Sequence, residues 1–208
     1  MKISPLYFLL ICFICCSSCE SEQQRQIRQQ REEQQRIEIA EKEKQDQLAR
    51  EAQIEKERLE REIYNQFINN SLPNGATPYS YCYGENNYCS EYGCSQIKVK
   101  TPYNSDVLVT IKRNDVVVRH AYIVAGSSYT FEIPDGTYQT FFYYGKAWNP
   151  EKFMKNSSCG AIKGGFISDE TFGKDDPQTL NNNALEYELI LQKNGNFSTH
   201  PSNLNDAL

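Results

Sequence analysis

The sequence is poor in the side chains on which most active sites depend. Histidine occurs twice in 208 residues, as His120 and His200, so few general bases are available. Nucleophile-elbow, phosphate-loop and metalloprotease patterns are missing. Basic charge is also scarce, because 22 Lys and Arg face 27 Asp and Glu, and this disfavours electrostatic capture of nucleic acid. We therefore expect no enzymatic activity, no cofactor and no nucleic-acid partner.

Long apolar runs are missing too, apart from one short segment near the N-terminus. After Lys2, an apolar stretch covers residues 6–16, which is too short for a comfortable membrane span. It leads into Cys16-Ser17-Ser18-Cys19, so a small residue precedes Cys19. A basic start, a short apolar core and a small-residue exit are typical of an export signal.

This segment resembles a bacterial lipoprotein signal, in which a peptidase cuts before a cysteine that carries diacylglycerol. The resemblance implies a signal peptide over residues 1–18 and lipidation of Cys19. Cys16 stands where the usual pattern has an aliphatic residue, so ordinary secretion and an uncleaved anchor stay open as alternatives. Glu20 and Glu22 resemble the surface-export signal of Bacteroidota lipoproteins. The implied location is the cell envelope, with a lipid anchor in the outer membrane that faces the surface or the periplasm.

Residues 19–72 are expected to form a charged helical stalk. The stretch from Glu20 to Asn70 contains neither proline nor glycine and is rich in Glu, Gln, Arg and Lys, which favour a helix. Apolar residues recur at a spacing of eleven, at Ile37, Leu48 and Leu59. That spacing corresponds to about 3.67 residues per turn, close to a straight helix. Two interpretations stay open: a coiled coil that makes a homo-oligomer, and a single charged tether.

Downstream, the apolar period changes to two. Apolar and polar side chains alternate as in a sheet with one buried and one wet face, in residues 97–100, 107–112, 128–133 and 185–192. Asn114-Asp115 predicts a two-residue hairpin turn. The expected fold is mainly β with a long N-terminal helix: a small antiparallel β-sandwich over residues 78–195, followed by a flexible tail over residues 196–208 that includes His200.

One hairpin resembles a known family. The stretch from Ala125 to Gln139, with Pro134-Asp135-Gly136-Thr137-Tyr138 at its turn, is similar to the transthyretin-like modules of bacterial surface proteins, including the PEGA and carboxypeptidase-regulatory families. In those modules a Pro-x-Gly-x-Tyr turn joins two strands of a sandwich. The resemblance implies that Tyr138 packs inward, and it implies a fold without a ligand.

Four cysteines remain in the mature part of an exported chain, and an even number predicts two disulfides. Three pairings are open; we favour Cys82 with Cys89 and Cys94 with Cys159, which would fix a long irregular loop over residues 147–184. A zinc site of four thiolates is the alternative, but the spacings lack Cys-x-x-Cys knuckles, so we expect no metal. A catalytic dyad of Cys159 and His120 would need a free thiol, so we expect no catalytic residue.

Aromatic residues are the remaining candidates for binding. Phe141, Tyr143 and Trp148 follow the turn at Pro134, and consecutive aromatics cannot all face one side of a strand. They either form an exposed platform for a protein or glycan partner or cover both faces of the sheet. The function expected is a non-enzymatic envelope lipoprotein that displays a β-sandwich interaction module on a helical spacer. The alternative is a periplasmic inhibitor or enzyme that uses the loop over residues 147–184.

Overall fold

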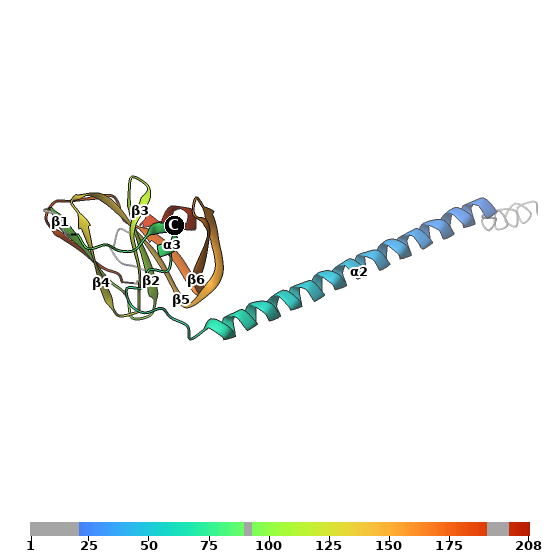
Figure 1. Cartoon of the computed structure of the whole chain (residues 1–208). Coiled ribbons are helices and arrows are strands. Elements are labelled where there is room, and N and C mark those ends of the chain that lie inside the picture. Colours follow the sequence, from blue (N-terminus) through green and yellow to red (C-terminus); the bar gives the residue numbers. More distant parts are fainter. Residues whose placement is uncertain (1–20, 90–92, 191–199) are drawn as a thin grey trace, which may run out of the picture. The chain divides into compact units, whose positions relative to one another are not determined.

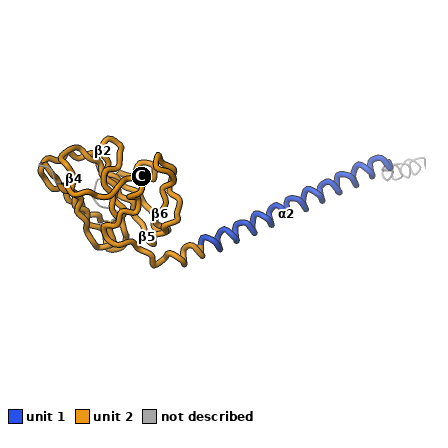
Figure 2. The backbone as a smooth tube through the Cα atoms, viewed as in Figure 1, with its two compact units in different colours: residues 1–60 blue, residues 61–208 orange. Residues whose placement is uncertain are grey.

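The computed structural model describes residues 21–89, 93–190 and 200–208. The expected signal peptide, residues 1–18, and the lipidation site Cys19 lie outside these ranges. The chain divides after Glu60 into two compact units, which Figure 2 distinguishes by colour. No helix within the described ranges is both long enough and apolar enough to span a membrane.

Residues Glu22–Phe67 form α2, a single continuous helix. Charged and amide side chains one turn apart contact each other along it; for example, Gln47 donates to Glu51 at 2.9 Å and Arg58 pairs with Glu55 at 2.6 Å. The whole helix has no buried residue, and the apolar side chains of its eleven-residue repeat are exposed. The predicted helix is therefore confirmed, while its self-association stays a prediction.

The β domain consists of two sheets that face each other (Figure 1). The small sheet has the order β4 (Ser128–Pro134), β1 (Cys94–Lys100), β8 (Ala184–Glu188). The large sheet has the order β3 (Val116–Ile123), β2 (Asp106–Arg113), β5 (Gly136–Ser157), β6 (Gly160–Lys174), β9 (His200–Pro201), and β7 (Gln178–Leu180) pairs with the start of β5. All of these strand pairs are antiparallel except β1 with β8, which is parallel. The predicted mainly β fold with a preceding long helix is confirmed.

Two turns are formed as the sequence predicts. Asn114 and Asp115 have φ angles of 51° and 62° and join β2 to β3, because both residue types tolerate positive φ. The turn at Pro134 carries the chain from β4 in the small sheet to β5 in the large one. Just beyond it, Tyr138 is buried and its hydroxyl donates to the carbonyl of Pro134 at 2.8 Å. The inward packing of Tyr138 is therefore confirmed.

The inner core lies between the two sheets. It collects every second residue of the strands that face it, such as Val107, Val109 and Ile111 of β2 and Phe131 and Ile133 of β4. The small sheet keeps polar side chains on its other face, where Lys98 pairs with Glu186 at 2.9 Å. The prediction of one buried and one wet face therefore holds for the small sheet.

The large sheet is buried on both faces along the central parts of β2, β3 and β5. Its outward residues pack into a second cluster, the outer core, which contains Tyr79, Leu108, Tyr122, Tyr143, Trp148, Met154, Ile162, Phe166 and Leu208. The prediction of a wet face is therefore wrong for this sheet. The physical reason is that segments outside the regular strands supply the missing apolar surface.

Residues 147–184 do not form the expected loop. Most of them belong to β5 and β6, which pair in register as far as Ser157 and Gly160. Several register shifts, and positive φ angles at Ala147, Gly164 and Asp169, interrupt the pairing. These irregularities break the two-residue alternation, and this is why a β-hairpin resembled a loop in the sequence. The alternative function, a periplasmic inhibitor or enzyme that uses these residues, stays an untested prediction.

The expected flexible tail, residues 196–208, is also wrong for its described part. His200–Pro201 forms β9 against β6, and α4 (Leu204–Ala207) packs on the large sheet. The side chains of Ala207 and Leu208 are buried. Ala207 and Leu208 are enough to hold this mostly polar segment in place, because their side chains pack against the outer core.

Candidate functional site

The segment before β1 covers the free edge of β3. Gly75 donates its N–H to the carbonyl of Tyr122 at 2.7 Å, and Tyr122 donates back to Ala76 at 2.8 Å. Further along β3, the side chain of Asn86 accepts from the N–H of His120 at 3.2 Å and donates to its carbonyl at 2.8 Å. This segment includes the short helix α3 (Ser80–Tyr83) and thus forms one wall over the outer core.

His120 is a buried structural residue and not an exposed base. Its side chain is fully buried, and its Nε2 accepts from the N–H of Tyr79 at 3.1 Å. Burial lowers the pKa of His120 from 6.5 to about 4, so the imidazole is neutral near pH 7. The ring stacks on that of Tyr79, with centroids 6.0 Å apart.

Two disulfides are present, as the sequence predicts, but the favoured pairing is wrong. Cys82 is bonded to Cys159, and Cys89 to Cys94, with Cα–Cα distances of 5.4 and 6.0 Å. Cys159 lies in the turn between β5 and β6, which the fold brings to α3 and therefore to Cys82. The predicted loop had no such turn, so the sequence could not indicate this proximity. The thiol of Cys159 is thus unavailable for a catalytic dyad with His120.

An apolar groove of about 510 Å³ opens beside this disulfide-linked region. It is lined by Leu72, Ala76, Thr77, Pro78, Tyr81, Trp148, Pro150, Ala161, Lys163 and Gly164. Trp148 is buried among these residues, and a Cβ on Gly164 would lie only 2.7 Å from the indole Cζ2. Glycine is therefore needed where the backbone of β6 passes over the indole ring.

Tyr81 holds one side of the groove in place. Its hydroxyl donates to the carbonyl of Ala161 at 3.2 Å and accepts from the N–H of Lys163 at 3.0 Å. The side chain nevertheless stays 56% exposed, so much of its ring is available to a partner. Lys163 lies at the same rim, 3.5 Å from Glu151. The lining is mostly apolar, with polar groups on Thr77, Tyr81 and Lys163, and such a mixture is common in protein interaction sites.

The three predicted binding aromatics are buried, so the exposed platform is wrong. Tyr143 and Trp148 are 1% exposed, and Phe141 is 5% exposed. Tyr143 and Trp148 lie in the outer core, whereas Phe142 and Tyr144 lie in the inner core. The other interpretation, that the aromatic run as a whole covers both faces of a sheet, is therefore what the structure shows. Of the three, only Trp148 lines the groove. Tyr81, Ala161 and Lys163 were missed, because only the β5–β6 hairpin brings them together.

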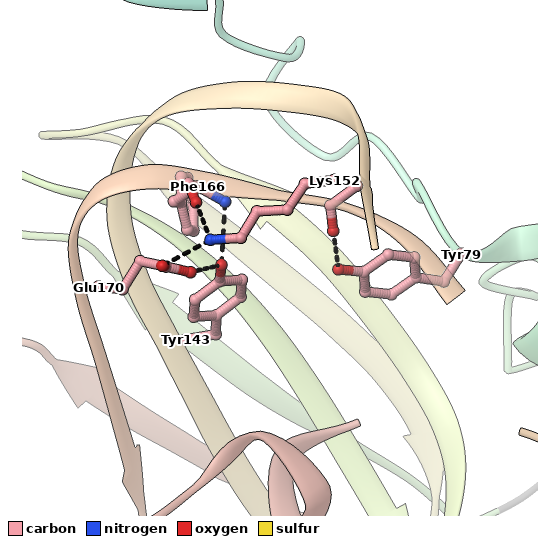
Figure 3. A network of polar contacts seen from close by, with 6 residues as sticks. Tyr79, Tyr143, Lys152, Phe166 and Glu170 are labelled. Carbon is pink, nitrogen blue, oxygen red and sulfur yellow. Dashed lines mark hydrogen bonds and ion pairs between the residues drawn. The ribbon is translucent and has the colours of Figure 1, made fainter. Parts of the chain in front are cut away.

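A polar network fixes the bend of this hairpin (Figure 3). The hydroxyl of Tyr143 donates to Glu170 and accepts from the N–H of Phe166 at 2.9 Å. Lys152 binds Glu170 at 2.5 Å and the carbonyl of Phe166 at 2.6 Å. Burial and, after it, the hydrogen bond to Glu170 raise the pKa of Tyr143, so its hydroxyl stays a donor. No local pattern in the sequence indicates this network, because its members pair across irregular parts of the hairpin.

A comparison with protein-family models, curated proteins and solved structures found no match to this chain. The resemblance to lipoprotein signals and to transthyretin-like modules therefore stays a prediction carried by the residues quoted above. Within the ranges that the structure describes, no three His, Cys, Asp or Glu side chains gather in a geometry that could hold a metal ion.

Proposed function

We propose that this protein is an envelope lipoprotein that carries a non-enzymatic interaction module on a helical spacer. The observation that carries the proposal is the pair of disulfides in the β domain, because such crosslinks persist in exported proteins and are rare in the cytosol. The 46 residues of α2, none of them buried, suit a spacer that is about 70 Å long at 1.5 Å per residue. Cys19 is the proposed anchor, in the outer membrane.

The apolar groove is the proposed contact for a protein or glycan partner. Its aromatic and proline side chains offer rigid apolar surface, and the half-exposed ring of Tyr81 stands at its rim. Aromatic side chains with a polar tip are enriched at protein interfaces. The groove lies in the disulfide-linked part of the domain, so its walls need little ordering when a partner binds.

The anchor is tested by fractionating cells that make the wild-type chain or the Cys19→Ala variant. We expect the wild-type protein with the membranes and the variant in the soluble fraction, because one lipid-bearing cysteine holds the chain. Cys16→Ala is the matched control and should stay with the membranes. Protease treatment of intact cells then separates a surface location from a periplasmic one. A soluble wild-type protein with reduced cysteines would contradict the proposal.

The groove is tested with a charge placed inside it. Ala161→Arg puts a long cation on the groove wall, and Ala184→Arg puts the same side chain on an exposed position of β8. A photo-crosslinker at position 163 on envelope-bound protein reports the partner. We expect crosslinked products that Ala161→Arg removes and Ala184→Arg retains. Equal yields from both variants would show that the groove is not the contact.

A further inference from the structure

Residues 200–208, here called the strap, are held by a row of side chains from the body of the domain. Four consecutive strap carbonyls each accept a hydrogen bond: Asn205 from Lys155 at 3.3 Å, Asp206 from Lys112, Ala207 from Thr110 at 2.5 Å and Leu208 from Tyr83 at 2.6 Å. The donors come from β2, β5 and α3. Such a row of side-chain donors binds the backbone carbonyls of a peptide. Binding of this kind depends little on the side chains of the peptide.

The side chains of the strap add two specific contacts. Leu208 is buried in the outer core, and Ala207 is buried beside it. The carboxylate of Asp206 lies 3.1 Å from Lys174. Lys112 and Lys155 stand nearby, and burial lowers the pKa of both ammonium groups. The surface that holds the strap, here called the seat, contains Tyr83, Thr110, Lys112, Lys155 and Lys174. The seat therefore combines an apolar pocket for leucine with positive charge that suits an acidic residue two positions before that leucine.

Three segments cover the outer core: the α3 segment, the end of the β5–β6 hairpin and the strap. The strap alone among them has no covalent crosslink to another segment. The α3 segment is bonded to the β5–β6 turn through Cys82–Cys159, whereas the strap contains no cysteine. Its strand pairing is limited to two residue pairs with β6. It also folds locally, since Asn203 caps α4 by accepting from the N–H of Asp206 at 3.0 Å. A segment of this kind can detach and rebind without unfolding its surroundings.

We propose that the seat of the strap is a peptide-binding site that also accepts residues 200–208 of a second copy of this chain. The ligand class is a short peptide with a small residue followed by leucine and with an aspartate before them. A second copy is the occupant favoured by the structure, because its strap matches every contact of the seat and exchange needs no new interface. The inference does not depend on the lipid anchor or on the groove.

The first test uses the chain without residues 200–208 and a labelled peptide His-Pro-Ser-Asn-Leu-Asn-Asp-Ala-Leu. Fluorescence anisotropy should show saturable binding to this variant, and at least about tenfold weaker binding to the full chain, whose seat is occupied. A peptide carrying Leu208→Ala should bind at least about tenfold more weakly, because its apolar anchor is truncated. Absence of binding to a folded deletion variant would overturn the proposal.

A second measurement holds even if the deletion variant does not fold. Native-state hydrogen exchange on the full chain follows the amides of Ala207 and Leu208, which donate to Asn203 and Leu204 within the strap. We expect these amides to exchange through an opening that leaves the amides of β2 protected. Exchange of the strap only together with β2 would overturn the proposal, because the strap would then not detach.

The source of the peptide is tested by mixing two full-length variants. One variant carries Leu208→Asp, which removes the apolar anchor of the strap. The other carries Thr110→Val, which removes a hydrogen-bond donor of the seat. A seat from the first and a strap from the second should form a complex of two chains, whereas neither variant should form it alone. Peptide binding without this complex would reject the second copy as the occupant.

Discussion

The two sheets of the β domain share the inner core but differ in what covers their outer faces. The small sheet leaves Lys98, Lys100 and Glu186 in water, so each of its strands alternates as an amphipathic strand should. The large sheet has no such face along the central parts of β2 and β3, since Leu108 and Tyr122 are buried on the side away from the inner core. The same fold therefore contains one sheet that follows the simple rule and one that does not.

The difference lies in the irregular segments and not in the strands themselves. Residues 70–87, the distal half of the β5–β6 hairpin and the strap all pack over the large sheet. They also carry the Cys82–Cys159 disulfide and the apolar groove. A second core built from such segments is what allows a binding site on the outer face of a sheet, because loops held on a rigid scaffold are the usual place for contacts.

The largest expected effect comes from removing the disulfide of the outer cover. Cys82 and Cys159 are 77 residues apart, whereas Cys89 and Cys94 are 5 apart. Loop-closure entropy then predicts a loss of about 4–5 kcal/mol for Cys82→Ala with Cys159→Ala, against about 2 kcal/mol for Cys89→Ala with Cys94→Ala. Urea unfolding of the two double variants measures both values. Equal losses of unfolding free energy would mean that the Cys82–Cys159 disulfide stabilises the domain no more than the short-range disulfide does.

The free energy of unfolding should depend on pH through His120, which is buried in the large sheet. The folded protein keeps His120 neutral down to its pKa of about 4, whereas the unfolded chain protonates near 6.5. Between these values the unfolded state binds more protons, so the free energy of unfolding falls as the pH is lowered, by about 3 kcal/mol in total. His120→Gln should flatten this dependence between pH 6.5 and 5. An unchanged slope would place the titrating group elsewhere.

The tight packing of the outer core can be tested with one matched pair of glycines. Gly164 and Gly160 have φ angles of 107° and 103°, but only Gly164 faces the indole of Trp148; nothing lies within 4 Å of a Cβ at Gly160. Both alanine variants carry a backbone strain of about 1–3 kcal/mol. Thermal unfolding should show an additional loss for Gly164→Ala alone. Identical melting temperatures would mean that Trp148 moves aside freely.

The sequence predicts the inner faces of both sheets but fails at the outer face of the large one, for a physical reason. Alternation shows which residues face the inner core, as at Ile97 and Val99, and turn chemistry gives Asn114-Asp115. Alternation cannot show that Leu108 and Tyr122 are buried by segments far away in the sequence. The pairing of Cys82 with Cys159 and the groove at Tyr81 depend on the same long-range contacts, so neither could be read from local patterns.

The smallest expected effect completes the contrast between the two outer faces. Lys98 and Glu186 form a cross-strand pair on the small sheet, with side chains 44% and 57% exposed. Such exposed pairs are screened by solvent and contribute less than about 1 kcal/mol. Lys98→Ala should therefore change the free energy of unfolding by at most this amount, and added salt should weaken the effect. Thr110→Val, at a buried outward position of the large sheet, should cost more, because the carbonyl of Ala207 then loses its donor. If Lys98→Ala proved the more damaging of the two in urea unfolding, the small sheet would also have a structured outer face.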